Sequence, residues 1–216
     1  MKILVSYISS RYDLSETIKK IDSSIADGIH VDLMDGIYVH QSNSLPNLEN
    51  ISKPIDIHLM VDNPKNYFAK LLKLNPVCIY IHPSTTNNFY DDYEYLKSNN
   101  IGLGVVINPN EDIAVFEKYF PYVKRVLLMS VYPGLGGQSF IKSTKDRLTE
   151  LKNFKDKYDF DIYIDGGINA ETIKDVDSAD GVVSGSFICL SENYDEQIRK
   201  LKENRLWMKK NYTKVY

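Results

Sequence analysis

The sequence predicts an α/β fold, a single (β/α)8 TIM barrel domain over residues 1–216. Eight short apolar runs alternate with polar, helix-forming stretches, which is the element order of such a barrel. Most runs are continuously apolar, as is typical of parallel strands covered by helices. Glycines cluster after the sixth, seventh and eighth runs, and barrels often bind phosphate late in the chain. The alternative, a doubly wound open sheet, usually has its glycine-rich loop after the first strand, and residues 6–12 contain no glycine.

The predicted elements follow one another in order along the chain. Strands are expected at residues 2–6, 28–32, 55–59, 77–81, 103–107, 125–129, 161–165 and 180–184. Asn63 and Pro64 predict an N-cap followed by proline at the first helical position, ahead of an amphipathic helix over residues 65–74. Further helices are expected over residues 143–158, from Asn169 onward, and over residues 192–211, where Trp207 is the expected packing anchor.

Composition is that of an ordinary globular protein, with 43% hydrophobic and 25% charged residues. A net charge of −3 gives no reason to expect a nucleic-acid partner or a membrane surface. Cys78 lies in an apolar run and is expected to be a buried thiol rather than half of a disulfide, which fits a reducing cytoplasm. The apolar run at the start is too short for a signal peptide, and none reaches transmembrane length.

Two histidines and two aspartates at predicted strand ends suggest a metal site. His30 and Asp32 are two residues apart on one strand and therefore point to the same side. His58 ends the next strand and Asp165 ends the seventh. Two nitrogen and two oxygen ligands suit Zn²⁺, Fe²⁺, Mn²⁺ or Co²⁺. Either histidine alone reads better as a hydrogen-bonded core residue, but the pair at matching places in successive strands favours the metal.

The two aspartates are also candidates for proton transfer. In a closed barrel, Asp32 and Asp165 lie across the mouth from each other, so a small substrate between them would present one face to each. One carboxylate could then remove a proton and the other could return one on the opposite side. The alternative is that either aspartate caps the helix that follows it. Asp35 is interpreted as mainly structural, because Asp35-Gly36 is an ordinary turn pair.

Glycines and a serine after the last two strands predict a phosphate site. Gly166, Gly167 and Gly185 would let backbone N–H groups approach an anion closely, and Ser186 adds a hydroxyl at a helix start. Residues 133–138, which contain three glycines, follow the sixth strand and could form a mobile lid over the substrate. The alternative for that segment is a surface turn.

Three methionines fall at predicted strand ends: Met34, Met60 and Met129. A single methionine is by default a core filler. Three at the same mouth favour an apolar lining that excludes water from a carbanion-like intermediate.

Taken together, these residues resemble the ribulose-phosphate 3-epimerase family, from Ser6 to about Ile188. The motifs that carry the resemblance are His30-Val-Asp-Leu-Met-Asp-Gly36, His58-Leu-Met-Val61, Asn108-Pro109, Met129-Ser-Val-Tyr-Pro-Gly-Leu-Gly-Gly-Gln138, Asp165-Gly-Gly-Ile168 and Gly185-Ser186. That family is a (β/α)8 barrel with one divalent metal. The resemblance implies that the metal ligands are His30, Asp32, His58 and Asp165. It implies that substrate and phosphate are held by Ser6, His58, Gly134, Leu135, Gly136, Gly137, Gly166, Gly167, Gly185 and Ser186.

The resemblance also implies a reaction, the conversion of D-ribulose 5-phosphate to D-xylulose 5-phosphate in the pentose phosphate pathway. The metal acts as a Lewis acid on the ketose phosphate. One aspartate removes the C3 proton to give a cis-enediolate, and the other returns a proton to the opposite face. By analogy with the family, Asp32 is the base and Asp165 the acid in the ribulose direction. Related barrels assemble through exposed helix faces and loops, so a homo-oligomer is expected as one possible state.

Three segments depart from the family pattern. Residues 37–41 read Ile-Tyr-Val-His-Gln where the family usually has His-Phe-Val-Pro-Asn. Residues 82–84 read His-Pro-Ser where strand four normally ends in His-x-Glu, and Tyr132 stands where an acidic residue or Asn is frequent. None of the three segments contains a predicted metal ligand or acid–base residue. They indicate a divergent member or a specialised paralogue.

Three other functions compete with this interpretation. A D-allulose-6-phosphate 3-epimerase would share the metal and both acids, and His82-Pro83 looks more like that branch, whereas residues 165–168 look more like the ribulose branch. A non-catalytic barrel that binds a sugar phosphate would have no need of Asp32 and Asp165. A metal-free decarboxylase or synthase on the same barrel would typically use a strand-end lysine, which the predicted strands do not offer.

Overall fold

The computed structural model describes residues 1–212, with side-chain surroundings for residues 1–204. Eight parallel strands close into a barrel in sequence order, each paired with its neighbours in the chain and β8 paired with β1. The strands are β1 (Lys2–Ser6), β2 (Gly28–Met34), β3 (Ile55–Met60), β4 (Cys78–Ile81), β5 (Gly102–Ile107), β6 (Arg125–Met129), β7 (Asp161–Asp165) and β8 (Gly181–Ser184). The predicted fold class is confirmed, and all eight predicted strands are present with ends shifted by two residues at most.

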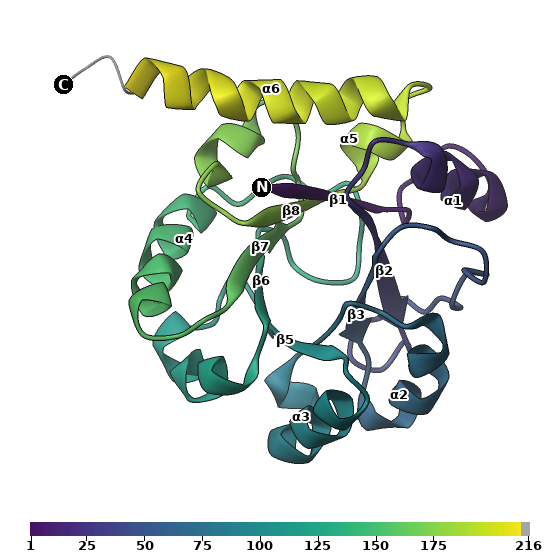
Figure 1. The fold of residues 1–216 in the computed structure, drawn as a ribbon, viewed down its shortest axis with the longest axis vertical. Coiled ribbons are helices and arrows are strands. Elements are labelled where there is room, and N and C mark those ends of the chain that lie inside the picture. The colour runs from purple at the N-terminus through teal and green to yellow at the C-terminus, as the bar shows by residue number, and fades with distance from the viewer. Residues whose placement is uncertain (213–216) are drawn as a thin grey trace.

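Helices surround the barrel, as the view along its axis shows (Figure 1). The α-helices are α1 (Leu14–Ser23), α2 (Lys65–Leu71), α3 (Phe89–Ser98), α4 (Thr144–Lys152), α5 (Ser186–Cys189) and α6 (Tyr194–Tyr212). Shorter 3-10 segments are η1 (Leu72–Leu74), η2 (Pro83–Thr85), η3 (Ile113–Tyr122), η4 (Asn153–Asp156) and η5 (Thr172–Val176). Within residues 1–212, no helix has the length and apolar character needed to cross a membrane.

Local helix signals were only partly correct. Asn63 adopts a left-handed conformation with φ of 48°, and Pro64 takes the N-cap position without a side-chain cap bond. The prediction of an asparagine cap at this helix was therefore wrong. Asn169 Oδ1 accepts hydrogen bonds from the backbone N–H groups of Glu171 and Thr172, but the element that follows is the 3-10 segment η5, whose N-cap is Glu171. Trp207 lies outside the residues whose side chains are described.

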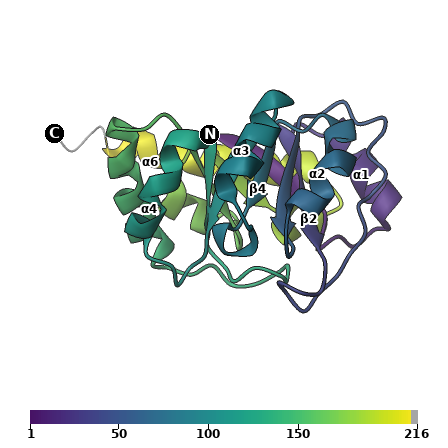
Figure 2. The same ribbon diagram turned by 90° about the horizontal axis from the view of Figure 1, so that it is seen from below.

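Parallel pairing brings the predicted functional residues to one end of the barrel. Asp32 pairs with His58 across β2 and β3, and Met129 pairs with Asp165 across β6 and β7. All four lie at or near the C-terminal ends of their strands, where barrel enzymes carry their active sites. The long loops that follow β2 and β6 extend from this same end, at the lower edge of Figure 2.

Two apolar layers hold the barrel together. The larger one lies between the outward faces of the strands and the helices and contains Cys189, whereas Cys78 lies in the smaller one; both cysteines are buried and free. The smaller one fills the barrel interior and contains the fully buried rings of Tyr80 and Tyr163. Below them Asp56 and Arg125 form a buried ion pair, and Tyr80 Oη donates to Asp56 Oδ2 at 3.1 Å. The barrel interior is thus a packed core, and Asp56, Arg125 and Tyr80 form hydrogen bonds with one another toward the N-terminal ends of the strands.

Gly104 makes room for one of the interior tyrosines, since a Cβ added there would overlap the Tyr80 ring. We expect Gly104→Ala to reduce the free energy of unfolding by about 1–3 kcal/mol, because a fully buried ring cannot move aside without displacing its neighbours. Urea denaturation of the two proteins measures this change. A variant as stable as the parent would contradict the tight packing of the interior.

Candidate active site

His30, Asp32, His58 and Asp165 converge at the C-terminal end of the barrel, as the sequence predicted. One ligand atom from each lies within 4.8 Å of those of the other three. His30 Nε2 is 3.5 Å from Asp32 Oδ1 and 3.8 Å from Asp165 Oδ2. His58 Nδ1 is 3.2 Å from Asp32 Oδ1 and 3.9 Å from Asp165 Oδ2. Two nitrogens and two carboxylates therefore surround one small volume.

His30 provides the test of whether this group fits a metal ion. Its side chain is completely buried, and neither ring nitrogen has a hydrogen-bond partner among the described residues. A core histidine kept for packing would have partners, because an unsatisfied buried polar group is costly. The donor set of two imidazoles and two carboxylates is one that divalent transition metals accept. The four residues therefore can hold a metal ion.

Polar neighbours hold both aspartates in place. Ser6 Oγ donates to Asp32 Oδ2 at 2.7 Å, so the structure places this predicted substrate-binding hydroxyl on a carboxylate. Asn43 Nδ2 donates to the backbone carbonyl of Asp32 at 2.9 Å. Ser130 Oγ donates to the backbone carbonyl of Asp165 at 2.8 Å. These bonds fix the backbone and the orientation of Asp32 and the backbone of Asp165.

The two carboxyl groups have different acidities. Burial would raise the pKa of Asp32, but His30 and His58 beside it hold that pKa well below its usual range. Burial raises the pKa of Asp165 to about 7; His30 partly opposes this rise, and the negative charge of Asp32 adds to it. The arrangement thus favours a charged Asp32 beside a readily protonated Asp165, which is the splitting that a base and an acid in one site require.

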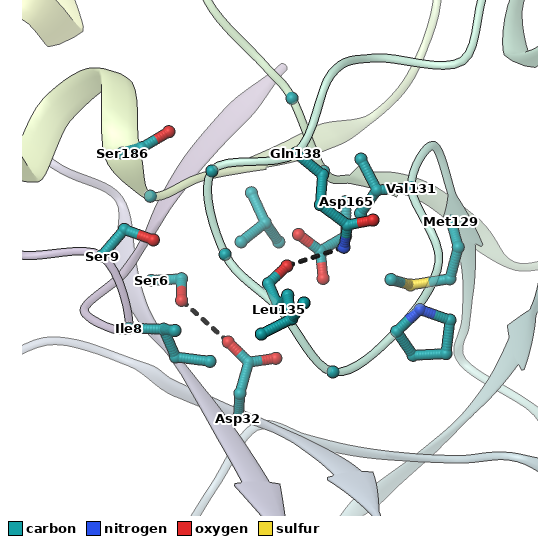
Figure 3. A pocket seen from close by; sticks show the side chains of 18 of the residues that line it. Ser6, Ile8, Ser9, Asp32, Met129, Val131, Leu135, Gln138, Asp165 and Ser186 are labelled. Atoms are coloured by element: carbon teal, nitrogen blue, oxygen red, sulfur yellow. Dashed lines mark hydrogen bonds between the residues drawn. The ribbon is translucent and has the colours of Figure 1, made fainter. Parts of the chain in front are cut away.

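A pocket opens above these residues (Figure 3), and the carboxyl groups of Asp32 and Asp165 point into it. The predicted residues that line it are Ser6, Asp32, His58, Met60, Met129, Gly134, Leu135, Gly136, Gly137, Asp165, Gly166, Gly167, Gly185 and Ser186. His30 and Met34 are buried outside this lining. Two of the three methionines predicted to line the mouth therefore reach the pocket, whereas Met34 does not.

Gly166 and Gly167 adopt backbone conformations that only glycine takes easily. Their φ angles are 115° and 63°, and a Cβ at Gly167 would overlap the backbone of Phe140. Gly185 and Ser186 follow β8, and Ser186 begins the short helix α5. The predicted phosphate-binding segments thus meet at one side of the pocket, with backbone and a hydroxyl rather than a cation.

The segment predicted as a lid lines the pocket, and hydrogen bonds within the segment hold its shape. Gln138 Nε2 donates to the backbone carbonyls of Tyr132 and Leu135, at 2.6 and 2.8 Å. Gly136 packs directly against Ser9 in the loop after β1, so a Cβ there would overlap the serine hydroxyl. The segment therefore contacts the loop after β1 across the pocket, while Leu135, Gly136 and Gly137 remain exposed on its outer side.

His82 is a residue of this site that the sequence did not reveal as functional. It follows β4 and is buried, and its Nε2 lies 2.9 Å from His58 Nε2. Burial and the neighbouring His58 hold the pKa of His82 well below the usual range. Tyr38, from the segment that departs from the family pattern, reaches the other nitrogen of His82. Asp35 is structural as predicted, because its carboxylate accepts backbone bonds from Ile37, Tyr38 and Asp62.

Comparison with known sequences identifies the relatives of this chain. A sequence model of the ribulose-phosphate 3 epimerase family matches residues 2–189. A protein of Helicobacter pylori (strain J99) named ribulose-phosphate 3-epimerase is 35% identical over 215 residues, covering 95% of this chain and 98% of that protein. Proteins of the same name from Bacillus subtilis (strain 168) and Aquifex aeolicus are 33% identical over 181 residues and 35% identical over 198 residues, covering 80% and 88% of this chain and 83% and 89% of those proteins.

Solved structures share the fold at low identity. A 3-hexulose-6-phosphate synthase from Salmonella typhimurium superposes with a TM-score of 0.66 at 16% identity, covering 96% of this chain and 99% of that one. A tryptophan synthase from Mycobacterium tuberculosis superposes with a TM-score of 0.67 at 13% identity, covering 94% and 92%. At such identities the likeness shows the barrel and nothing about the reaction.

Proposed function

This chain belongs to the ribulose-phosphate 3-epimerase family, and we propose on that basis that it inverts C3 of D-ribulose 5-phosphate to give D-xylulose 5-phosphate. The observation that carries the proposal is the pair Asp32 and Asp165: the buried Asp32 and the half-buried Asp165 point their carboxyl groups into one pocket, and the pKa is lowered for Asp32 and raised for Asp165. The test is to incubate the protein with pure D-ribulose 5-phosphate and to monitor by ¹³C NMR whether a mixture of the two C3 epimers forms. A reaction of this kind would belong to the pentose phosphate pathway.

Asp32 is the proposed base and Asp165 the proposed acid in the ribulose direction. The charged Asp32 would take the C3 proton, and the protonated Asp165 would return one to the other face of the cis-enediolate. Ser6 donates to Asp32 Oδ2, whereas Asp32 Oδ1 lies beside His30 Nε2 and His58 Nδ1. In the reverse direction the two groups exchange roles, because a completed turnover leaves Asp32 protonated and Asp165 charged.

His30, Asp32, His58 and Asp165 would hold one divalent metal, either Zn²⁺, Fe²⁺, Mn²⁺ or Co²⁺. When bound, such an ion supplies Lewis-acid polarisation of the ketose carbonyl and acidifies the neighbouring C–H. The chain itself supplies the orientation, since both histidines come from adjacent paired strands and are fully buried. Met60 and Met129 would keep bulk water away from the reacting carbon.

We assign the phosphate of the substrate to the segments after β7 and β8. Backbone N–H groups near Gly166, Gly167 and Gly185 and the hydroxyl of Ser186 would hold it without a cationic side chain. The segment over residues 133–138 would cover the substrate from the other side. In this assignment the phosphate is held by residues other than the two aspartates, although Gly166 directly follows Asp165 in the chain.

Ser186→Ala is expected to weaken substrate binding more than it slows chemistry. Loss of one hydrogen bond to a charged phosphate would raise KM by about tenfold, with kcat within about twofold of the parent, because such bonds contribute roughly 1.5–3 kcal/mol. Steady-state kinetics of the two proteins separate these effects. Ser191→Ala, which alters a serine beyond the same short helix, is the matched control. An unchanged KM would remove Ser186 from the phosphate site.

A further inference from the structure

A row of hydrogen bonds runs from His58 away from the metal site to the loop after β2. His58 Nε2 lies 2.9 Å from His82 Nε2. His82 Nδ1 lies 3.0 Å from Tyr38 Oη, and Asn108 Nδ2 donates to Tyr38 Oη at 3.1 Å. His58, His82 and Asn108 are buried, and Tyr38 is half-buried. We refer to the three contacts that link His58, His82, Tyr38 and Asn108 as the Tyr38 relay.

The two histidines constrain each other, because their Nε2 atoms share a single hydrogen. If His58 Nδ1 offers its lone pair to a metal, a neutral His58 must carry its hydrogen on Nε2 and donate to His82. His82 Nε2 then accepts, so a neutral His82 must carry its own hydrogen on Nδ1. That N–H points at Tyr38 Oη, which must accept. When the metal site is filled, each hydrogen bond of the relay therefore has a fixed donor: His58 donates to His82, and His82 donates to Tyr38.

We infer that Tyr38 is a positioning residue for the metal site: by accepting from His82 Nδ1–H, it holds His58 in the tautomer whose Nδ1 lone pair faces Asp32 and Asp165. This inference rests on the metal site proposed above. Tyr38 is neither among the residues that line the pocket nor one of the four ligands, and its hydrogen bond toward the site is the one to His82.

A hydroxyl suits this position because it can also support the opposite direction. Tyr38 O–H can donate to His82 Nδ1, His82 Nε2–H to His58 Nε2, and His58 Nδ1–H to Asp32 Oδ1, 3.2 Å away. Each histidine keeps one hydrogen in both arrangements, so the net charge does not change and the hydrogens only exchange between ring nitrogens. A hydroxyl, unlike a carboxylate or an ammonium, both donates and accepts.

The relay also explains one of the departures from the family pattern. At the position of Tyr38 the pattern has phenylalanine, which offers no hydrogen bond, and Ser84 replaces the glutamate that the pattern has two residues after the strand-four histidine. The Tyr38 hydroxyl is thus a feature of this chain and not of the pattern, and it is the side chain that reaches His82 Nδ1.

Tyr38→Phe tests the inference on the whole protein without substrate. We expect its Zn²⁺ affinity, measured by competition with a chromophoric chelator, to fall by about tenfold, the lower end of the loss caused by removing a ligand's direct partner, because Tyr38 acts one hydrogen bond further out than His82. Long-range ¹H–¹⁵N NMR on the Zn²⁺-loaded parent should show His82 as the Nδ1–H tautomer, a measurement eased by there being four histidines. In the loaded variant the same tautomer would leave His82 Nδ1–H without its Tyr38 acceptor, which is the cost that lowers the affinity.

Tyr158→Phe is the matched control, because Tyr158 donates to Glu117 and precedes β7, at the opposite end of the barrel. It should leave Zn²⁺ affinity unchanged. Equal Zn²⁺ affinity of Tyr38→Phe and the parent would overturn the inference, as would an Nε2–H tautomer of His82 in the loaded parent. The second measurement needs no variant and so does not depend on whether Tyr38→Phe folds. A parent that binds no Zn²⁺, Fe²⁺, Mn²⁺ or Co²⁺ would overturn the proposed metal site itself.

Discussion

Asp165→Asn is expected to lower the rate of C3 inversion by about 10²–10⁴-fold, the usual contribution of a positioned general acid or base. The amide is nearly isosteric with the carboxyl group but cannot deliver a proton. The bond from Ser130 to the backbone of residue 165 does not involve the side chain and should survive. Asp32→Asn should be as severe, because the amide cannot take up the C3 proton, although its oxygen can still accept from the Ser6 hydroxyl.

The stereochemistry of residual exchange makes this prediction sharper. With Asp165 altered, only the face served by Asp32 could exchange its C3 hydrogen with solvent, so residual deuterium uptake should occur with retention of configuration. NMR of the sugar phosphate in D₂O measures both quantities. Asp161→Asn, at the exposed opposite end of the same strand, is the matched control and should leave the rate unchanged. Substantial inversion by Asp165→Asn would contradict the two-acid mechanism.

Removal of the divalent metal is expected to abolish turnover reversibly. His30 has no hydrogen-bond partner among the described residues, and two carboxylates lie beside it, so a cation bound between these groups would pair with His30 and both carboxylates. Dialysis against a chelator, with residual metal quantified by mass spectrometry, should leave under about one hundredth of the rate. Adding back Zn²⁺, Fe²⁺, Mn²⁺ or Co²⁺ singly should restore it and identify the ion that the site prefers.

Thermal unfolding distinguishes this result from simple loss of structure. The metal-free protein should still unfold cooperatively, because the apolar layers around and inside the barrel do not involve the four ligands. Full activity in protein that holds less than about one tenth of an equivalent of any of these metals would contradict the proposed site.

The strands and their order could be predicted because each is a short, continuously apolar run, and residues buried on both faces leave such a record in the sequence. Parallel pairing then brings strand ends together, which is why His30, Asp32, His58 and Asp165 meet as predicted. The pattern was less informative about helix starts: the prediction of an Asn63 cap was wrong, because Asn63 adopts a left-handed conformation and Pro64 takes the N-cap position.

Contacts between distant loops could not be predicted in the same way. The Tyr38–His82 bond joins residues 44 apart in the sequence, and nothing in the local pattern around either indicates the other. His82 was visible as a strand-end histidine, but only the pairing of β3 with β4 brings it beside His58. Ser6 was expected to contact the substrate, and in the structure its hydroxyl donates to Asp32. This bond could not be predicted, because the sequence around a serine does not indicate which residue its hydroxyl will contact.

The central claim is that this protein inverts C3 of a five-carbon ketose phosphate by proton exchange, and solvent deuterium incorporation tests it most directly. Metal-loaded protein is incubated in D₂O with D-ribulose 5-phosphate and, separately, with D-allulose 6-phosphate, and the C3–H signal is followed by NMR. We expect exchange with inversion in the five-carbon substrate and little in the six-carbon one. Exchange chiefly in the six-carbon substrate, or none in either with metal bound, would contradict the proposed function.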